Sequence, residues 1–349
     1  MEDARNTLTP APLVEVTRGS ITESRHHGHV VAVDGDGRIV AQLGAPEIIT
    51  YLRSSAKPLQ AVPLISTGAA DCFHFTPQEI AVACGSHSGE PLHEETVAVM
   101  LGKTGLGTGA LKCGVHEPFS KEVALELRQD GLRPRVLQNN CSGKHTGMLA
   151  LALHLGGAPE TYDQPDNPAQ LAIAHTVAQF SDIHPEEIAI GIDGCGVPVF
   201  GVSVRAMALT YARLVAPPGN FDAKTQAACA RIVAAMRAHP ELVGGTRERL
   251  DTELMRAAGG VISKVGAEGV YTVGVQPSRR WPRGLGLALK IEDGEDRRAR
   301  PTVVIESLRQ LGVLDDAALE RLAPYAKFVV RNHRGDEVGE VRASFELKL

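Results

Sequence analysis

Strand-like and helix-like hydrophobic patterns occupy different parts of the chain. Alternating apolar and polar positions predict strands mainly towards the two ends, at 13–16, 29–33, 38–43, 187–192, 269–275, 284–291, 327–330 and 338–346. Apolar residues three or four positions apart predict helices, at 76–84, 91–101, 120–129, 144–155, 168–180, 204–214, 221–238, 249–258, 302–311 and 316–322. The glycine-rich residues 259–266 are interpreted as an approach to the strands that follow.

This order of elements predicts an α/β (α+β) fold. Strands from the N- and C-terminal segments can pair in one antiparallel sheet, with helices packed on it and a helical subdomain inserted. We expect a single domain over 1–349. Its approximate parts are 1–72 plus 186–349, which contain the sheet, and 73–185, which are mainly helical.

The stretch 52–59 places a hydroxyl and an amine three residues apart at a predicted helix start. Residues i and i+3 share a helix face, so the amine of Lys57 can lie against Ser54. A serine beside a neutral lysine is an activated nucleophile, and the free N–H groups of a helix start can stabilise an oxyanion. The alternative is that Ser54 or Ser55 only caps a short core helix.

Two later motifs strengthen the catalytic interpretation. Serine acyl-transferases without histidine combine a Ser-x-x-Lys with a second serine on a turn and a Lys-x-Gly on a late strand. Ser86 and Lys264 supply these in the same order. Ser54 would attack a carbonyl, Lys57 would take its proton, and Ser86 would pass a proton to the leaving nitrogen. Val265 replaces the usual Ser or Thr of the third motif, which does not favour a β-lactam substrate.

Composition excludes several other classes of protein. The chain has 349 residues, 43% of them hydrophobic and 22% charged, and a net charge of −5 without a basic stripe, so nucleic acid is not an expected partner. No stretch approaches the length of a membrane span, and no apolar run follows Met1–Asn6 as a signal peptide would require. Six scattered cysteines suggest reduced thiols. We therefore expect a cytoplasmic protein.

One group of histidines suggests a metal at first sight. His26, His27 and His29 lie within five residues of one another. Successive residues of a strand point to alternating faces, however, so these side chains do not converge. We interpret this stretch as an exposed strand start.

Six stretches together resemble the rhizobial-type L-asparaginases, whose fold is similar to that of serine β-lactamases and glutaminases. They are Glu15-Val16-Thr17-Arg18-Gly19, Glu23-Ser24-Arg25-His26, Arg53-Ser54-Ser55-Ala56-Lys57-Pro58, Cys84-Gly85-Ser86-His87-Ser88, Asn139-Asn140-Cys141-Ser142-Gly143-Lys144-His145 and Asp193-Gly194-Cys195-Gly196-Val197-Pro198. The resemblance implies hydrolysis of L-asparagine to L-aspartate and ammonia. It implies Ser54 with Lys57 as the nucleophilic pair and Ser86 with Lys264 as a second pair.

The same resemblance implies one zinc ion per chain, held by Cys141, Lys144 and Cys195. Spacing alone favours the packing of two small buried cysteines, because zinc sites commonly use Cys and His. His145 and Asp193 are next to these ligands in sequence and are candidates for hydrogen bonds to the ligands, to water or to the substrate. We also place Asn140 among the substrate-binding residues.

The carboxylate of an amino-acid substrate needs a cation. Arg53, beside the proposed nucleophile, is the candidate, and an exposed arginine in solvent is the alternative.

Two alternatives to an asparaginase remain. The same serines could serve a glutaminase or another amidase or esterase, since one methylene in a pocket changes binding by only about 1–3 kcal/mol. A catalytically silent zinc-binding scaffold is the alternative from another class, and it is disfavoured by the four reactive Ser and Lys side chains. A homodimer is implied by the resemblance alone.

Overall fold

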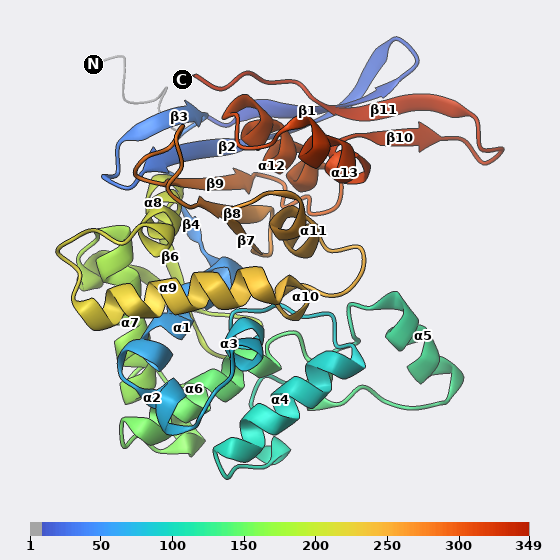
Figure 1. The fold of residues 1–349 in the computed structure, drawn as a ribbon. Coiled ribbons are helices and arrows are strands. Elements are labelled where there is room, and N and C mark those ends of the chain that lie inside the picture. The colour runs from blue at the N-terminus through green and yellow to red at the C-terminus, as the bar shows by residue number, and fades with distance from the viewer. Residues whose placement is uncertain (1–8, 349) are drawn as a thin grey trace. The chain divides into compact units, whose positions relative to one another are not determined.

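The computed structural model describes residues 9–348, and the chain folds into two units (Figure 1). The segment Met1–Asn6, on which the signal-peptide prediction rests, lies outside the described residues. The sheet unit consists of residues up to Ser55, Val202–Ala216, and residues from Glu253 onward. The helical unit consists of Ala56–Gly201 and Pro217–Thr252.

One eight-stranded antiparallel sheet forms the sheet unit. Its strands are β1 Ala11–Arg18, β2 Ile21–Asp34, β3 Ile39–Leu43, β7 Val261–Val265, β8 Val270–Val275, β9 Leu285–Ile291, β10 Phe328–Arg331 and β11 Glu337–Ala343. They follow the order β10-β11-β1-β2-β9-β8-β7, with β3 also paired to β2. N-terminal β1 and β2 pair with C-terminal β11 and β9, so the predicted sheet from the two ends of the chain is confirmed.

Helices pack on this sheet where its residues are small. The sheet unit contains α8 Val204–Val215, α12 Ala299–Gln310 and α13 Asp316–Ala326, together with the short strand β4 Ile49–Tyr51. A Cβ atom at Gly286 of β9 would come within 1.8 Å of the Ala208 oxygen of α8, so only glycine allows this approach. The hydroxyl of Tyr211 in α8 donates to the Ser55 carbonyl oxygen at 2.8 Å and so fixes the chain just after Ser54.

Two local predictions in this unit are wrong. The glycine-rich approach at 259–266 contains a strand of its own, β7, because Val261 and Ile262 are fully buried against the sheet. The expected exposed strand start at 25–29 lies inside β2, and His26 and His29 are buried. Their ring nitrogens bind the carboxylates of Asp293 at 2.6 Å and Glu292 at 2.9 Å, which makes burial of the two rings possible.

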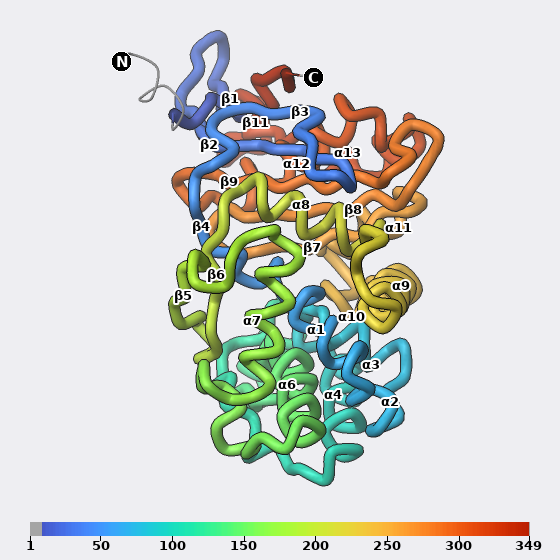
Figure 2. The backbone as a smooth tube through the Cα atoms, turned by 90° about the vertical axis from the view of Figure 1, so that its left-hand side faces the viewer, coloured from blue at the N-terminus to red at the C-terminus, as the bar shows by residue number. Residues whose placement is uncertain are grey.

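The helical unit is built around one buried helix. Its helices are α1 Lys57–Ser66, α2 Ala69–Cys72, α3 Pro77–Ala83, α4 Pro91–Lys103, α5 Lys121–Gln129, α6 Ser142–His154, α7 Pro168–Ser181, α9 Ala223–Ala238 and α10 Pro240–Val243. Helix α6 contacts α1, α3, α4 and α7, which surround it in Figure 2. Gly143 and Gly147 allow this, because a Cβ at Gly143 would lie 2.5 Å from the Val82 oxygen of α3.

The remaining elements are short or join the two units. In the helical unit, strand β5 Ala189–Ile192 pairs antiparallel with β6 Pro198–Ser203. The 3-10 turns are η1 Arg53–Ala56, η2 Thr108–Ala110, η3 Val136–Gln138, η4 Pro159–Thr161 and η5 Pro185–Glu187. Helix α11 Leu250–Ala257 contains the change from the helical to the sheet unit.

The helical unit is larger than the predicted 73–185. It begins at Ala56 and takes in α9 and α10 from a later part of the chain. Helix α1 packs on α6 and α7, while α9 packs on α1 and α3, so their apolar sides are buried among helices. Sequence order had placed them with the sheet. Among the described residues, no helix combines the length and apolarity needed to cross a membrane.

Candidate active site

The predicted helix start at Ser54 is confirmed. The 3-10 turn η1 leads directly into α1, with Pro58 in the first turn of the α-helix, where its missing N–H costs nothing. Arg53 has a φ of 51°, a left-handed conformation that non-glycine residues seldom adopt and that is concentrated at functional sites. Its guanidinium lies 4.0 Å from Glu268. Arg53, Ser54 and Lys264 belong to the sheet unit, and the other predicted site residues to the helical unit.

Lys264 lies on β7 and is fully buried. Its amine donates to the carbonyl oxygen of the next residue, Val265, at 3.0 Å, and its own carbonyl oxygen accepts from Thr272 at 3.1 Å. The predicted placement of this lysine on a late strand of the sheet is therefore correct, although the strand itself was not predicted.

Lys57 and Ser86 form a serine–lysine contact inside the helical unit. The Nζ atom of Lys57 lies 2.9 Å from Ser86 Oγ, 2.7 Å from the Gly85 oxygen and 3.1 Å from the Asn140 oxygen. The amine donates to both carbonyl oxygens and to Ser86 Oγ, and it is also hydrogen-bonded to the Cys141 side chain. This geometry lets Lys57 accept a proton from Ser86 or return one to it.

Burial is the main influence on the Lys57 amine. The side chain is 1% exposed, and burial lowers the pKa of its amine. The thiol groups of Cys141 and Cys195 oppose that shift, whereas the neighbouring charge of Lys144 adds to it. Within the helical unit the cation that contributes to the lowered pKa is Lys144.

The structure therefore pairs Lys57 with Ser86, 29 residues away in the chain. The sequence analysis had paired Lys57 with Ser54 and Ser86 with Lys264. Ser86 reaches Lys57 because α3 ends at Cys84 and its chain then turns back, with the Ser86 N–H donating to the Val243 oxygen at 2.8 Å. That turn passes close to the backbone at Leu242, since a Cβ on Gly85 would meet its oxygen at 2.6 Å.

Two asparagines shape the turn that precedes α6. The side chain of Asn139 donates to the Cys113 oxygen at 2.9 Å and accepts from the Cys141 N–H at 2.8 Å. Asn140 offers its carbonyl oxygen to Lys57, and its N–H donates to His116 Nε2 at 3.0 Å. His116 was not singled out from the sequence, because a lone histidine in a loop carries no pattern.

Cys141, Lys144 and Cys195 converge as the resemblance implied. Cys141 caps the start of α6, Lys144 is in its first turn, and Cys195 lies in the turn between β5 and β6. The Lys144 amine donates to Cys195 Sγ at 2.9 Å, and the two thiols are hydrogen-bonded to each other. All three side chains are buried.

These donors are chemically suited to zinc. The hydrogen bond from Cys195 holds the pKa of the Cys141 thiol well below its usual range, so this pair offers a thiolate. Burial would lower the pKa of Lys144, but the two thiol groups together raise it, so a metal ion would have to replace a proton on this amine. Among residues 9–348, no group of three His, Cys, Asp or Glu side chains could hold a metal, so a site here requires the lysine.

His145 and Asp193 lie beside this cluster. His145 is fully buried, and its Nδ1 atom is hydrogen-bonded at 2.6 Å to the Tyr162 hydroxyl, which also accepts from the Lys112 N–H at 2.8 Å. Burial lowers the pKa of His145 well below its usual range, and its Nε2 atom has no partner among the described residues. The Asp193 carboxylate accepts from the Gly194 N–H at 2.9 Å.

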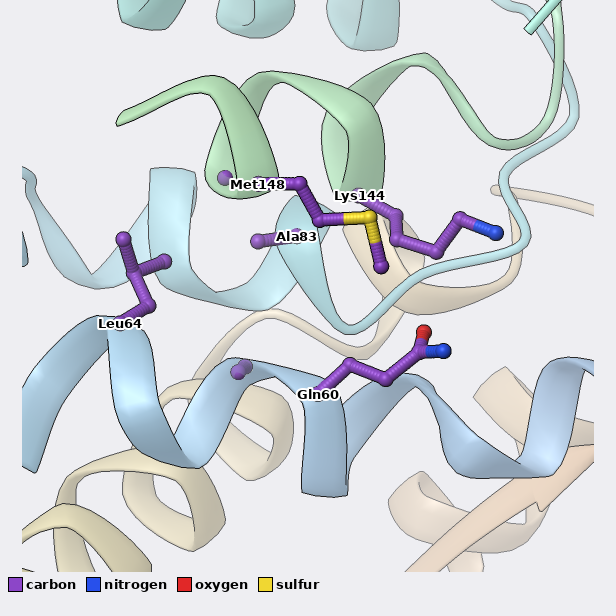
Figure 3. Close-up of a pocket in the computed structure, with 7 residues that line it drawn as sticks. Gln60, Leu64, Ala83, Lys144 and Met148 are labelled. Atoms are coloured by element: carbon purple, nitrogen blue, oxygen red, sulfur yellow. The ribbon is translucent and has the colours of Figure 1, made fainter. Parts of the chain in front are cut away.

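A small cavity adjoins Lys144. Its lining residues are Gln60, Ala61, Leu64, Ala83, Lys144, Gly147 and Met148. It has room for one water molecule. In Figure 3 the polar ends of Gln60 and Lys144 extend to the same side, near the Met148 thioether. Gln60 Oε1 has no partner among the described residues and can bind a water there.

Three comparisons place the chain among known proteins. The sequence model of L-asparaginase II matches residues 14–343. Among curated proteins, none matches. Solved structures with some similarity include a probable glutaminase from Bacillus subtilis complexed with 6-diazo-5-oxo-L-norleucine (15% identity, TM-score 0.41, 82% of this chain and 85% of that chain). A β-lactamase from Burkholderia vietnamiensis is another (16% identity, TM-score 0.35, 86% of this chain and 93% of that chain).

The family match spans the sheet and helical units and nearly the whole chain. It includes the helix start at Ser54, the Lys57–Ser86 contact and the converging Cys141, Lys144 and Cys195. This chain belongs to the L-asparaginase II family.

Proposed function

We propose that the protein hydrolyses L-asparagine to L-aspartate and ammonia through an acyl-serine intermediate. Membership of the L-asparaginase II family makes the chain an amidohydrolase. The observation that carries the proposal is the buried Lys57 amine, which lies 2.9 Å from Ser86 Oγ and also contacts the Gly85 and Asn140 carbonyl oxygens. An amine arranged in this way can move a proton between a serine and a substrate.

The reaction is divided between Ser54, Lys57 and Ser86. Ser54 Oγ attacks the side-chain amide carbon of asparagine, while Lys57, three residues further along the chain, takes the hydroxyl proton. The proton then passes through Ser86 Oγ to the amide nitrogen, the C–N bond breaks, and ammonia leaves. Water next attacks the ester, giving its proton back through the same groups, so that aspartate and the free serine are restored. Arg53 is proposed to bind the substrate carboxylate.

In a second assignment of the catalytic roles, Ser86 is the nucleophile and Ser54 passes the proton to the leaving nitrogen. Only Ser86 belongs to the same unit as Lys57, and its hydroxyl contacts the amine directly, which favours it as the nucleophile. In either assignment Lys57 is the base. The two assignments differ in which serine carries the acyl group.

Zinc is proposed to be bound by Cys141, Lys144 and Cys195. When bound it would supply positive charge near the substrate and hold the turn before α6 beside the turn between β5 and β6. It would not be needed as a source of the nucleophile or the base, because the serine and lysine residues provide both. Asn140, His145 and Asp193 are proposed to contact substrate or water beside these ligands. We further propose that the protein is a homodimer, because of the family resemblance, and that it is cytoplasmic, because of its composition.

Ammonia release from purified protein tests the activity. We expect release from L-asparagine to exceed release from L-glutamine. A higher kcat/KM for glutamine would instead identify a glutaminase of the same chemistry. Absence of ammonia from both amides, in folded zinc-supplemented protein, would contradict the proposed function.

Metal removal should weaken substrate binding more than it slows the chemistry. The Cys195→Ser variant is expected to lose zinc and to raise KM, with a smaller fall in kcat than removal of the nucleophile causes, because zinc takes no part in the attack. Elemental analysis and steady-state kinetics with and without a chelator measure both effects. Cys72→Ser is the control, since Cys72 is an exposed free thiol.

Two outcomes count against this zinc assignment. If as-purified and zinc-soaked proteins both contain no metal, Cys141, Lys144 and Cys195 only pack. If the folded apoprotein is as inactive as a nucleophile variant, the metal takes part in the chemistry itself.

A further inference from the structure

Arg249 binds the turn that carries Ser86 at several points. Its Nη2 atom donates to the Ser86 carbonyl oxygen at 2.8 Å. Its Nη1 atom donates to Ser88 Oγ and to the Gly244 oxygen, both at 2.9 Å. The guanidinium also lies 5.7 Å from the centre of the Phe119 ring. One side chain therefore joins the Ser86 turn, residue 244 and an aromatic ring, all within the helical unit.

These contacts fix the backbone of Ser86 on both sides. The Ser86 N–H donates to the Val243 oxygen at 2.8 Å, and its carbonyl oxygen accepts from Arg249. The backbone torsions of Ser86 lie between these two hydrogen bonds, and they help to set where its Oγ atom points. Loss of the Arg249 bond removes one of the contacts that fix this peptide, and we expect the hydroxyl to shift from its position 2.9 Å from Lys57 Nζ.

Arg249 joins the Ser86 turn to the segment at residues 244–245, next to a direct bond from Ser88 Oγ to the Gly244 oxygen at 3.1 Å. A Cβ atom at Gly245 would lie 2.3 Å from Ser88 Oγ, so the two segments approach without intervening side chains. The acceptors Ser86 O, Ser88 Oγ and Gly244 O surround one planar group, which a guanidinium can bind at the same time with a fixed fork of donors. An ammonium is a single point donor and cannot reproduce that fork.

We propose that Arg249 is a positioning residue that holds the Ser86 hydroxyl against the Lys57 amine. This inference rests on the proposed catalytic role of Ser86. Arg249 itself needs no contact with substrate: it acts through the Ser86 backbone on the proton transfer. A residue with a purely structural role would lower the fraction of folded enzyme, whereas a positioning residue lowers kcat for each folded molecule and leaves KM nearly unchanged.

Arg249→Gln and Arg249→Lys test the proposal, with Arg247→Gln as the control. Arg247 is two positions away and its side chain is 77% exposed in an ion pair with Glu122. We expect a fall in kcat of roughly 10- to 100-fold for Arg249→Gln, since small misplacements of reacting groups have effects of that order. Arg249→Lys should be intermediate, and Arg247→Gln should match the wild type. Thermal unfolding measures the folded fraction of each variant.

Chemical rescue separates positioning from stability. Added guanidinium ion should restore part of the kcat of Arg249→Ala, because the removed side chain leaves space for a small planar cation beside the same three acceptors, and an equal concentration of sodium should not. The double variant Ser86→Ala/Arg249→Gln should be no slower than Ser86→Ala, because Arg249 acts on the reaction only through the Ser86 hydroxyl.

Clear results overturn the inference. Folded Arg249→Gln or Arg249→Lys with wild-type kcat rejects it, and so does a loss of activity that follows only the unfolded fraction. Should Arg249→Gln not fold, Arg249→Lys, which keeps the charge, decides alone. Full activity of Ser86→Ala would instead reject the proposed role of Ser86, whatever the Arg249 variants do.

Discussion

Ser54→Ala is expected to lower kcat by several orders of magnitude without unfolding the protein. The change removes the proposed attacking oxygen and very little volume, and loss of a nucleophile leaves only the contribution of binding and oxyanion stabilisation. Ammonia release under saturating L-asparagine measures the effect. Circular dichroism and thermal unfolding establish that the variant is folded.

Ser55→Ala is the matched control for that experiment. The Ser55 hydroxyl is buried and donates to the Leu52 carbonyl oxygen at 2.6 Å, so its loss should lower stability by about 1 kcal/mol and leave the chemistry in place. Mass spectrometry of protein quenched during turnover should find the acyl group on the peptide with Ser54. An acyl group on Ser86, with a folded and active Ser54→Ala, would support the exchanged assignment.

Lys57→Met is expected to lower kcat by roughly 10²- to 10⁴-fold, the range for loss of a general base. Methionine has nearly the same length and no basic nitrogen. The substitution also leaves the Gly85 and Asn140 carbonyl oxygens without this donor, which destabilises the fold by about 1–3 kcal/mol per buried group. Removal of the buried amine stabilises the fold and offsets part of that loss. We therefore expect a large kinetic effect and a modest change in Tm.

Lys121→Met controls for the loss of a lysine. Its amine is on the surface of α5 in an ion pair with Glu248, and its side chain is 81% exposed. This variant should retain wild-type kcat, because exposed ion pairs contribute little. A folded Lys57→Met enzyme with near-normal turnover would remove Lys57 from the mechanism under either assignment of the nucleophile.

Local spacing was enough to predict several parts of the site. Ser54 and Lys57 are three residues apart at a helix start, and η1 followed by α1 confirms that start. Cys141 and Lys144 are also three apart, at the start of α6. A period of three to four residues places such side chains on one side of a helix without knowledge of the rest of the fold.

Contacts between distant segments could not be predicted in this way. The Lys57–Ser86 pair depends on how α3 ends beside α1 and α6, and Arg249 reaches Ser86 across 163 residues of sequence. Arg249 had been counted only as the first residue of a helix. The burial of His26 and His29 could not be predicted for the same reason, since the carboxylates that permit it come from residues 292 and 293.

The sequence by itself determined the kinds of element, the strands at both ends and the chemistry available at each turn. Those features follow from local backbone preference and from the period of apolar residues. The tertiary structure alone decided the pairing of Lys57 with Ser86, the contacts of Arg249 with the Ser86 turn and the helices that join the helical unit. The reason is physical: apolar faces can be buried against several partners, and the arrangement that packs best selects among them.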